Sequence, residues 1–295
     1  MKSMRVDRPL WLALLLWLHL PTVAGARNVI DDDGLTVSVP PHVQRIVSLA
    51  PGATAVLFAA GAGDRLVGTA EYSDEPAAAR RIVRVGDSQH FDIERILALR
   101  PDVVVAWSGG TGAAQIERMA QLGLPIYRHR MAGLDDIAAS VRRMGVLAGT
   151  APIAEAAADL LARRVRQLRA RYAHAPQATV LIQVWDRPIY TVGRTQLLTD
   201  ALRTCGYRNV FDDLSGAGPA VGIEAVLARD PDVILAVAAP SLAEEWLARW
   251  RERRTLRAVT GERLYAVTDE RFSRLGPGVL DATEALCQAL AHPGR

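Results

Sequence analysis

An internal repeat constrains the fold of this chain more than any other feature of its sequence. Residues 91–106 (FDIERILALRPDVVVA) and residues 221–236 (VGIEAVLARDPDVILA) align at a spacing of 130 positions, with eight of sixteen positions identical. Each copy has apolar residues at helical spacing, a proline that ends the helix, and a β-branched run typical of a buried parallel strand. The repeat predicts two lobes of one α/β architecture.

Segments outside the repeat support this fold class. Residues 45–51 (RIVSLAP) read as a buried strand that ends at a turn, and a helix is expected from Thr54 to Ala60. The corresponding strand of the second half is Val180 to Trp185. Strands that alternate with helices predict a central parallel sheet in each lobe.

A strongly helical stretch at 134–175 separates the two halves. Leu134 to Ala148 is amphipathic, residues 149–152 (GTAP) interrupt it, and the stretch from Ile153 to about His174 contains no glycine or proline. A helix of about 22 residues is roughly 33 Å long, so it could join the lobes as a stiff rod. The alternative is one more packing helix. The domain prediction is an N-terminal lobe at 27–133, the connecting helical segment at 134–175 and a C-terminal lobe at 176–295.

The first 26 residues have the order of a secretory signal peptide. Basic residues precede an apolar run (LWLALLLWLHL, residues 10–20), and Ala24-Gly25-Ala26 supplies small residues for cleavage after Ala26. The alternative is a membrane anchor, but a spanning helix needs about 20 apolar residues. The prediction is an exported protein of the periplasm, processed at 1–26.

Export to an oxidising compartment affects the expected state of the cysteines. Cys205 and Cys287 are the only two, and in an oxidising compartment such a pair most simply forms a disulfide; two buried free thiols are the alternative. The histidines downstream of the leader are scattered without ligand spacing, so no resident metal site is expected: His42, His90, His129, His174 and His292.

Composition excludes several functions. The net charge is +3 without a long block of one sign, so nucleic acid is not an expected partner. Lys2 is the only lysine, which excludes lysine Schiff-base and phosphate-loop chemistry. Hydrolase, metalloprotease and dinucleotide motifs are absent from the sequence, so no enzyme and no cofactor are predicted.

Aromatic and charged residues lie instead at predicted strand ends and loops. In open α/β sheets, ligands bind beyond the carboxyl ends of the strands, so these residues face a common cleft if the lobes oppose each other. Any one of them could instead be a packing residue. The set is Tyr72, Trp107, Trp185, Arg187, Tyr190, Asp269, Arg271 and Arg274.

Six segments between Arg45 and Leu290 have the pattern of a known family: RIVSLAPGAT (45–54), EYSDEP (71–76), IERILALRPDVVVAWSGG (93–110), TCGYRNVF (204–211), IEAVLARDPDVI (223–234) and ALCQAL (285–290). Over this range the chain resembles the periplasmic cobalamin-binding proteins of ABC importers, within the wider group of binding proteins that capture cobalamin, haem and iron-siderophores. The resemblance implies a class III periplasmic binding protein: two similar lobes with central parallel sheets, joined by a long rigid helix.

The resemblance also implies the ligand site. Tyr72 matches a tyrosine that contacts the corrin, and Trp107 matches the tryptophan before the Gly-Gly turn. Asp269 and Arg274 resemble the acidic and basic residues that meet the ligand from the second lobe. The sequence departs from the family where Ser88 and Gly218 replace tryptophans and Val184 replaces a phenylalanine. We expect Trp185 and Tyr190 to compensate, which makes the predicted binding set Tyr72, Ser88, Trp107, Trp185, Tyr190, Asp269 and Arg274.

Glu94 and Glu224 occupy the same repeat position near two predicted helix N-termini, where a carboxylate is favoured by the helix dipole. The resemblance implies that both glutamates dock on an inner-membrane permease dimer. The alternative is that they only cap their helices.

The predicted function is capture of cobalamin or a related corrinoid by a monomer that delivers it to the permease. The alternatives are an iron-siderophore or haem receptor of the same fold, and an exported enzyme built on the same frame. Asp87 stands where haem binders of the group have a tyrosine, which disfavours haem unless His90 is a ligand.

Overall fold

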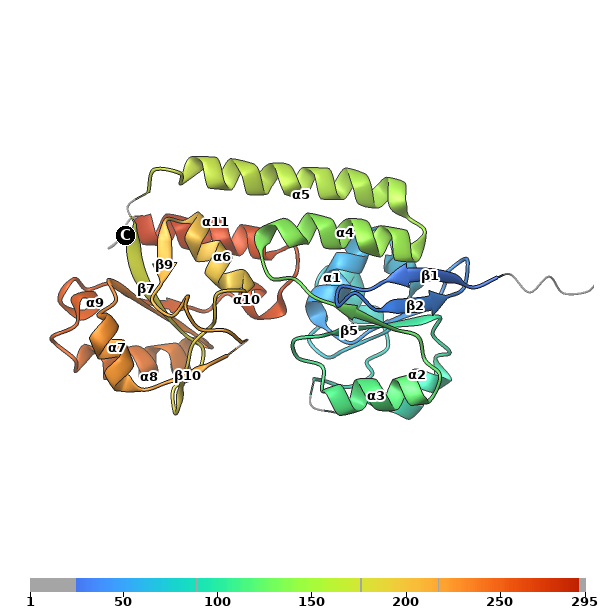
Figure 1. The fold of residues 1–295 in the computed structure, drawn as a ribbon, viewed down its shortest axis with the longest axis horizontal. Helices are drawn as coiled ribbons and strands as arrows, with labels where there is room; N and C mark the ends of the chain where they lie inside the picture. Colours follow the sequence, from blue (N-terminus) through green and yellow to red (C-terminus); the bar gives the residue numbers. More distant parts are fainter. Residues whose placement is uncertain (1–24, 89, 176, 217, 292–295) are drawn as a thin grey trace, which may run out of the picture.

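A computed structural model describes residues 25–88, 90–175, 177–216 and 218–291. Apart from Gly25 and Ala26, the predicted signal peptide at 1–26 therefore lies outside the described residues. Figure 1 shows two lobes side by side beneath a common layer of long helices. The predicted fold class is confirmed.

Each lobe is built on a four-stranded parallel sheet, as the repeat predicts. In the N-terminal lobe the sheet order is β4-β3-β5-β6, and in the C-terminal lobe it is β9-β7-β11-β12. If the four strands of each sheet are counted in chain order, the second lies at one edge and the first and third lie in the centre. The strands are β3 (Ile46–Ser48), β4 (Leu66–Thr69), β5 (Val103–Trp107), β6 (Ile126–His129), β7 (Ala178–Gln183), β9 (Tyr207–Asn209), β11 (Val233–Val237) and β12 (Leu264–Val267).

The two copies of the repeat form equivalent elements. Helices α2 (Ile93–Ala98) and α7 (Ile223–Arg229) lead into the central strands β5 and β11. Both helices lie at the lower tips of the lobes, opposite the layer of long helices (Figure 1). The remaining elements of the lobes are the hairpin β1 (Arg27–Ile30) and β2 (Thr36–Val39), the ribbon β8 (Ile189–Tyr190) and β10 (Ala220–Val221), and the helices α1 (Pro51–Ala59), α3 (Ala113–Gln121), α6 (Leu197–Thr204), α8 (Pro240–Arg251), α9 (Arg257–Thr260), α10 (Arg271–Arg274) and α11 (Val279–Ala291).

The predicted connecting segment forms two antiparallel helices. α4 (Leu134–Ala148) ends at Gly149, whose φ of +73° suits glycine. α5 (Ala151–Arg171) then runs back across both lobes (Figure 1). It begins two residues earlier than predicted, because Pro152 is accommodated in its first turn. Its length of 21 residues corresponds to about 31 Å.

Arginine ion pairs attach α5 to the helices beneath it. Arg142 of α4 binds Glu155 and Asp159 of α5, at 2.7 and 2.5 Å. Arg169 lies 2.7 Å from Asp135 of α4 and 3.2 Å from Asp200 of α6. Nearer the C-terminal lobe, Arg164 and Arg171 pair with Asp281 and Glu284 of α11. α5 is therefore tied to elements on both sides of the seam.

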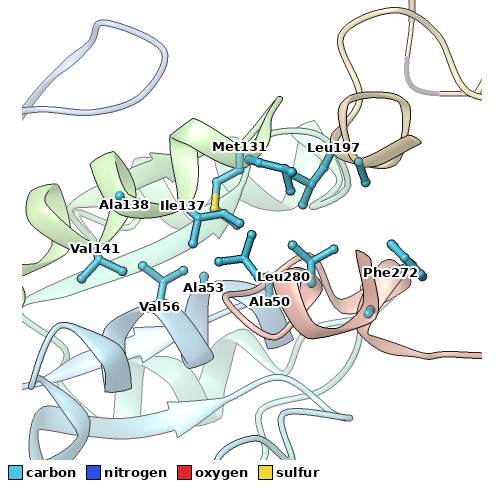
Figure 2. Close-up of a cluster of buried hydrophobic side chains, with 14 of the residues drawn as sticks. Ala50, Ala53, Val56, Met131, Ile137, Ala138, Val141, Leu197, Phe272 and Leu280 are labelled. Carbon is cyan, nitrogen blue, oxygen red and sulfur yellow. The ribbon is translucent and has the colours of Figure 1, made fainter. Parts of the chain in front are cut away.

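One hydrophobic cluster continues from lobe to lobe. Figure 2 shows Val56 of α1, Ile137 of α4, Leu197 at the start of α6 and Leu280 of α11 in the same cluster of buried side chains. The far faces of the two sheets have separate clusters. The lobes thus share apolar core at the seam, which favours small closure movements over a wide hinge.

Candidate functional site

A pocket of about 250 Å³ lies where the two lobes meet. Most of its wall comes from the N-terminal lobe, and α10 with the following residue closes it from the C-terminal lobe. The lining residues are Leu49–Ala53, Ala70–Tyr72, Asp87, Ser88, Trp107, Gly110, Thr111, His129, Met131 and Ser273–Leu275.

The N-terminal wall follows the carboxyl ends of the parallel strands. The pocket residues come directly after β3 and β4 and at or just beyond the last residues of β5 and β6. This is the edge of the sheet that the sequence predicts for ligand binding. The register pairs Trp107 with His129, so an indole and an imidazole lie on neighbouring strands at the pocket.

Tyr72 presents its ring to solvent at this edge. Its side chain is 70% exposed, although it borders the pocket, and its backbone has a φ of +61°, a region that bulky residues seldom occupy. Such conformations persist only where the surrounding structure holds them, and they concentrate at binding sites.

Arg84 holds the loop that carries Tyr72. One guanidinium nitrogen donates to Thr69 Oγ1 at 2.8 Å and to the carbonyl oxygens of Ala70 and Ser73 at 3.0 Å. The other donates to Asp74 at 2.9 Å. A single arginine thereby fixes the loop on both sides of Tyr72.

Hydroxyl groups fill the space beneath this loop. Thr54 Oγ1 lies 2.9 Å from Ser48 Oγ and 3.3 Å from Ser73 Oγ, and all three residues are buried. These contacts join the end of β3, the start of α1 and the Tyr72 loop. The backbone behind the pocket is therefore preorganised.

Trp107 packs against the glycine turn that follows β5. A Cβ atom on Gly109 would lie 3.0 Å from the indole ring, and one on Gly110 would collide with it. The Trp107 backbone N–H donates to Thr111 Oγ1 at 3.1 Å. The Gly-Gly turn thus accommodates the indole and leaves part of it available to the pocket.

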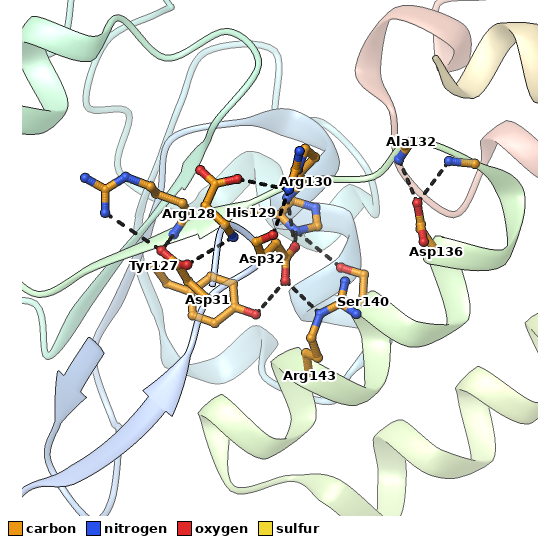
Figure 3. A network of polar contacts seen from close by, with 12 residues as sticks. Asp31, Asp32, Tyr127, Arg128, His129, Arg130, Ala132, Asp136, Ser140 and Arg143 are labelled. Carbon is orange, nitrogen blue, oxygen red and sulfur yellow. Dashed lines mark hydrogen bonds and ion pairs between the residues drawn. The ribbon is translucent and has the colours of Figure 1, made fainter. Parts of the chain in front are cut away.

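His129 belongs to a buried polar network shown in Figure 3. Its Nδ1 lies 3.1 Å from Asp32 Oδ2 and 3.2 Å from Ser140 Oγ. Asp32 also accepts from the Tyr127 hydroxyl at 2.8 Å and from the Arg130 backbone N–H at 2.8 Å, and it lies 2.7 Å from Arg143 Nε.

This network sets the charge of Asp32. Burial acts to raise its pKa, but hydrogen bonds from His129, the Arg130 backbone and Tyr127, together with the charge of Arg143, lower it to about 2. Burial and the neighbouring Asp32 carboxylate raise the pKa of Tyr127 above its usual value. Asp32 is therefore ionised at neutral pH while Tyr127 keeps its proton.

The C-terminal lobe contributes Arg274, which pairs with Glu270, the residue before α10, and lies 3.6 Å from Glu75 of the N-terminal lobe. The backbones of the lobes touch beside it. A Cβ atom on Gly52 would lie 2.7 Å from the carbonyl carbon of Leu275, so only glycine fits at this point of the seam.

The structure brings four of the seven predicted binding residues together. Tyr72, Ser88, Trp107 and Arg274 line the pocket. Trp185, Tyr190 and Asp269 do not: Trp185 is 57% exposed after β7, Tyr190 is in the β8–β10 ribbon, and the Asp269 carboxylate binds Arg271. The Arg271 hydrogen bond lowers the pKa of Asp269. Gly218, the second departure from the family pattern, is exposed and lies near Tyr190.

Sequence reasoning missed Leu49, His129 and Met131, which also line the pocket. His129 ends β6 and Met131 follows it, so the rule of carboxyl strand ends would have found both if it had been applied to the fourth strand. Leu49 directly follows β3 and is marked by the same rule.

The other predicted residues lie away from the pocket. Glu94 and Glu224 are exposed in the first turns of α2 and α7 at the lobe tips. The predicted disulfide between Cys205 and Cys287 is present, with its Cα atoms 5.0 Å apart, and it links the end of α6 to α11.

Among the described residues, no group of three or more histidine, cysteine or acidic side chains is placed to hold a metal ion. Over the same part of the chain, the helices are too short or too polar to cross a bilayer.

Known proteins are similar to this chain in sequence and fold. A family described as periplasmic binding protein matches residues 46–269. A vitamin B12-binding protein of Vibrio cholerae is 33% identical over 255 residues, which cover 85% of this chain and 90% of that protein. The crystal structure of the periplasmic vitamin B12 binding protein BtuF of Vibrio cholerae has a TM-score of 0.75 at 33% identity, covering 84% of this chain and 97% of the other.

Haem-binding relatives share the fold at lower identity. The periplasmic haem-binding protein RhuT from Roseiflexus has a TM-score of 0.71 at 21% identity, and the match covers 84% of this chain and 98% of RhuT. Proteins whose names give different ligands, vitamin B12 and haem, thus share this fold. From its matched sequence and fold, the chain belongs to the family of periplasmic binding proteins, which bind their ligands without catalysing a reaction.

Proposed function

We propose that this protein captures cobalamin or a related corrinoid in the pocket between its lobes and delivers it to an inner-membrane ABC permease. The observation that carries the proposal is the pocket itself, in which Tyr72 and Trp107 of one lobe oppose Arg274 of the other. Aromatic rings offer a large apolar contact area, and arginine binds amide oxygens and phosphate. A corrinoid presents an extended ring that aromatic side chains can contact, and amide and phosphate groups that an arginine can bind.

The dimensions of the pocket suit part of such a ligand. Its volume of about 250 Å³ is below the roughly 300–1,000 Å³ of sites that enclose a drug-sized molecule. A corrinoid would therefore place one part in the pocket and the rest against exposed rim residues such as Tyr72 and Ser88. The small side chain at Ser88 leaves room there for a bulky substituent.

Fluorescence titration tests the ligand. Residues 27–295 are mixed with cyanocobalamin, haem or a ferric siderophore, and tryptophan emission is followed. We expect quenching by the corrinoid, reduced in the Trp107→Phe variant; Trp185→Phe is the matched control for an indole outside the pocket. Binding of a ferric chelate or haem with no response to any corrinoid would reject the corrinoid assignment.

Glu94 and Glu224 are proposed to dock the lobe tips on the permease. Both carboxylates are exposed, and they occupy equivalent positions on the side of the molecule opposite α5. The variant Glu94→Ala/Glu224→Ala should keep its ligand affinity but support less transport in reconstituted vesicles. Glu155→Ala on α5 should leave transport unchanged. Equal loss of binding and transport in the double variant would contradict docking.

Cleavage of the leader after Ala26 is consistent with the start of the fold. Arg27 is the first residue of β1, and its guanidinium donates to the carbonyl oxygen of Val146 at 2.9 Å near the end of α4. Processing at this bond would leave the hairpin complete. Native mass spectrometry of the protein from the periplasm should give the mass of a monomer of residues 27–295; a larger mass per chain would place the cleavage elsewhere.

A further inference from the structure

We infer that His129 supplies an axial nitrogen ligand, through Nε2, to the metal ion at the centre of the bound complex. The inference rests on the proposed function, because it requires a ligand whose metal is already chelated and has one exchangeable axial position. It adds a metal contact that neither the sequence analysis nor the proposed corrinoid site contains.

The first observation is the position of the ring. His129 is only 2% exposed, yet it belongs to the pocket wall. Its Nδ1 is occupied by Asp32 and Ser140. Within the described ranges, no protein group binds Nε2, so this is the ring nitrogen left for a ligand.

The second observation is the chemistry of the partner. An ionised carboxylate only accepts hydrogen bonds, so the contact with Asp32 places the ring proton on Nδ1 and leaves a lone pair on Nε2. Tyr127, Arg130 and Arg143 hold Asp32 in place from three other directions. A carboxylate behind the far nitrogen is the usual arrangement for a metal-binding histidine, since it fixes the orientation and the tautomer of the ring.

The third observation is the isolation of this histidine. No cluster of three potential ligands exists in the described part of the chain, so a bare metal ion would find too few protein donors there. A metal inside a planar macrocycle needs only one. Trp107 is paired with His129 across β5 and β6, and both residues line the pocket, so an aromatic side chain lies on the strand next to the imidazole.

A role in anchoring the β1–β2 hairpin would not require an imidazole. Asp32 is already bound by the Tyr127 hydroxyl, by a backbone N–H and by the Arg143 guanidinium. The neighbouring Asp31 is held by the Arg128 backbone N–H, at 3.2 Å. The hairpin therefore keeps several contacts when His129 is replaced, which makes a His129 variant a usable probe.

Electron paramagnetic resonance tests the inference directly. The probe is cob(II)inamide, a corrinoid without its own nucleotide base, so any axial nitrogen must come from the protein. We expect each cobalt line of the complex with residues 27–295 to split into a nitrogen triplet, and ¹⁵N-labelled protein to convert the triplet into a doublet. His129→Ala should bind the probe at least about 10-fold more weakly, and its complex should lack the nitrogen splitting. Added imidazole should restore the splitting. His42→Ala, which removes an exposed histidine, should behave as the wild type.

The outcomes separate this inference from the proposed function. Binding of cob(II)inamide with no nitrogen splitting, or with splitting that persists in His129→Ala and His129→Gln, would overturn the axial ligand and leave the corrinoid function intact. Absence of binding by every corrinoid would overturn both.

Discussion

Asp102 and Asp232, which are 130 positions apart in the repeat, bind the first strand of their own lobe at the same point. Asp102 Oδ2 accepts from the backbone N–H of Gln44 and of Arg45, at 2.6 and 2.8 Å. Asp232 Oδ2 accepts from the backbone N–H and the hydroxyl of Thr179, at 2.8 and 2.7 Å. In both lobes this carboxylate fixes the start of the first strand beside the third, so the Pro-Asp pair of the repeat specifies strand pairing as well as a helix end.

Removal of either carboxylate should destabilise the fold. Asp232→Ala leaves the Thr179 N–H without its acceptor, and we expect a loss of about 1–3 kcal/mol in the free energy of unfolding, with a similar loss for Asp102→Ala. Urea denaturation followed by circular dichroism measures both. The exposed Asp64 is the control, and Asp64→Ala should change stability by no more than about 0.5 kcal/mol. Equal midpoints for all three variants would show that these bonds contribute nothing net.

Reduction of the disulfide should weaken the C-terminal lobe. The Cys205–Cys287 bond closes a loop with a sequence separation of 82, and the loss of a native disulfide of this kind costs about 2–5 kcal/mol. We expect dithiothreitol to lower the urea midpoint of the wild type. The double variant Cys205→Ser/Cys287→Ser should start at the lower midpoint and should not respond to the reductant; a response would mean that the shift has another source.

Arg84 should affect ligand binding through the Tyr72 loop. Arg84→Met removes every bond from the guanidinium to residues 69–74, and we expect about 10-fold weaker corrinoid binding together with faster amide exchange in that loop. Arg84→Lys should restore little, because a lysine cannot reproduce the planar fork. Arg81→Met changes an exposed neighbour and should leave affinity and exchange as they are. Unaltered exchange in Arg84→Met would remove the physical basis for this role.

Acid should destabilise the protein in part through Asp32. Its pKa is about 2 in the folded state against an ordinary 3.8, so the unfolded chain takes up the proton first as the pH falls. The stabilisation is complete above about pH 5 and is lost as the pH falls from about 4 to 2, with an upper bound of about 2.5 kcal/mol. Asp32→Asn should be less stable at pH 7 and should lose less on acidification through this range. Parallel stability curves for the two proteins would contradict the assignment.

Much of the fold could be predicted from the sequence because the information is local and repeated. The proline of each repeat and the β-branched run after it specify α2–β5 and α7–β11, and apolar periodicity locates α4. The order of strands in each sheet does not follow from these patterns, since it depends on long-range pairing such as that of Asp102 with the start of β3.

The site was predictable only in part. Tyr72, Ser88 and Trp107 lie near the carboxyl ends of strands of one sheet. Their proximity can therefore be predicted from the rule that ligands bind at these strand ends. Trp185 and Tyr190 follow the same rule in the other lobe but do not line the pocket, because its C-terminal wall is made by residues 273–275 instead. These residues meet the N-terminal lobe through long-range packing, as at Gly52, which no short stretch of sequence encodes.

The apolar cluster that continues across the seam has a consequence for expressing half of the molecule. A half-molecule cut within the α4–α5 connection would leave Val56 and Ile137, or Leu197 and Leu280, uncovered on one side. Such a piece would self-associate rather than remain a monomer in solution. Although the chain has a repeated structure, each half covers apolar surface of the other, so we expect the two halves to fold stably only together.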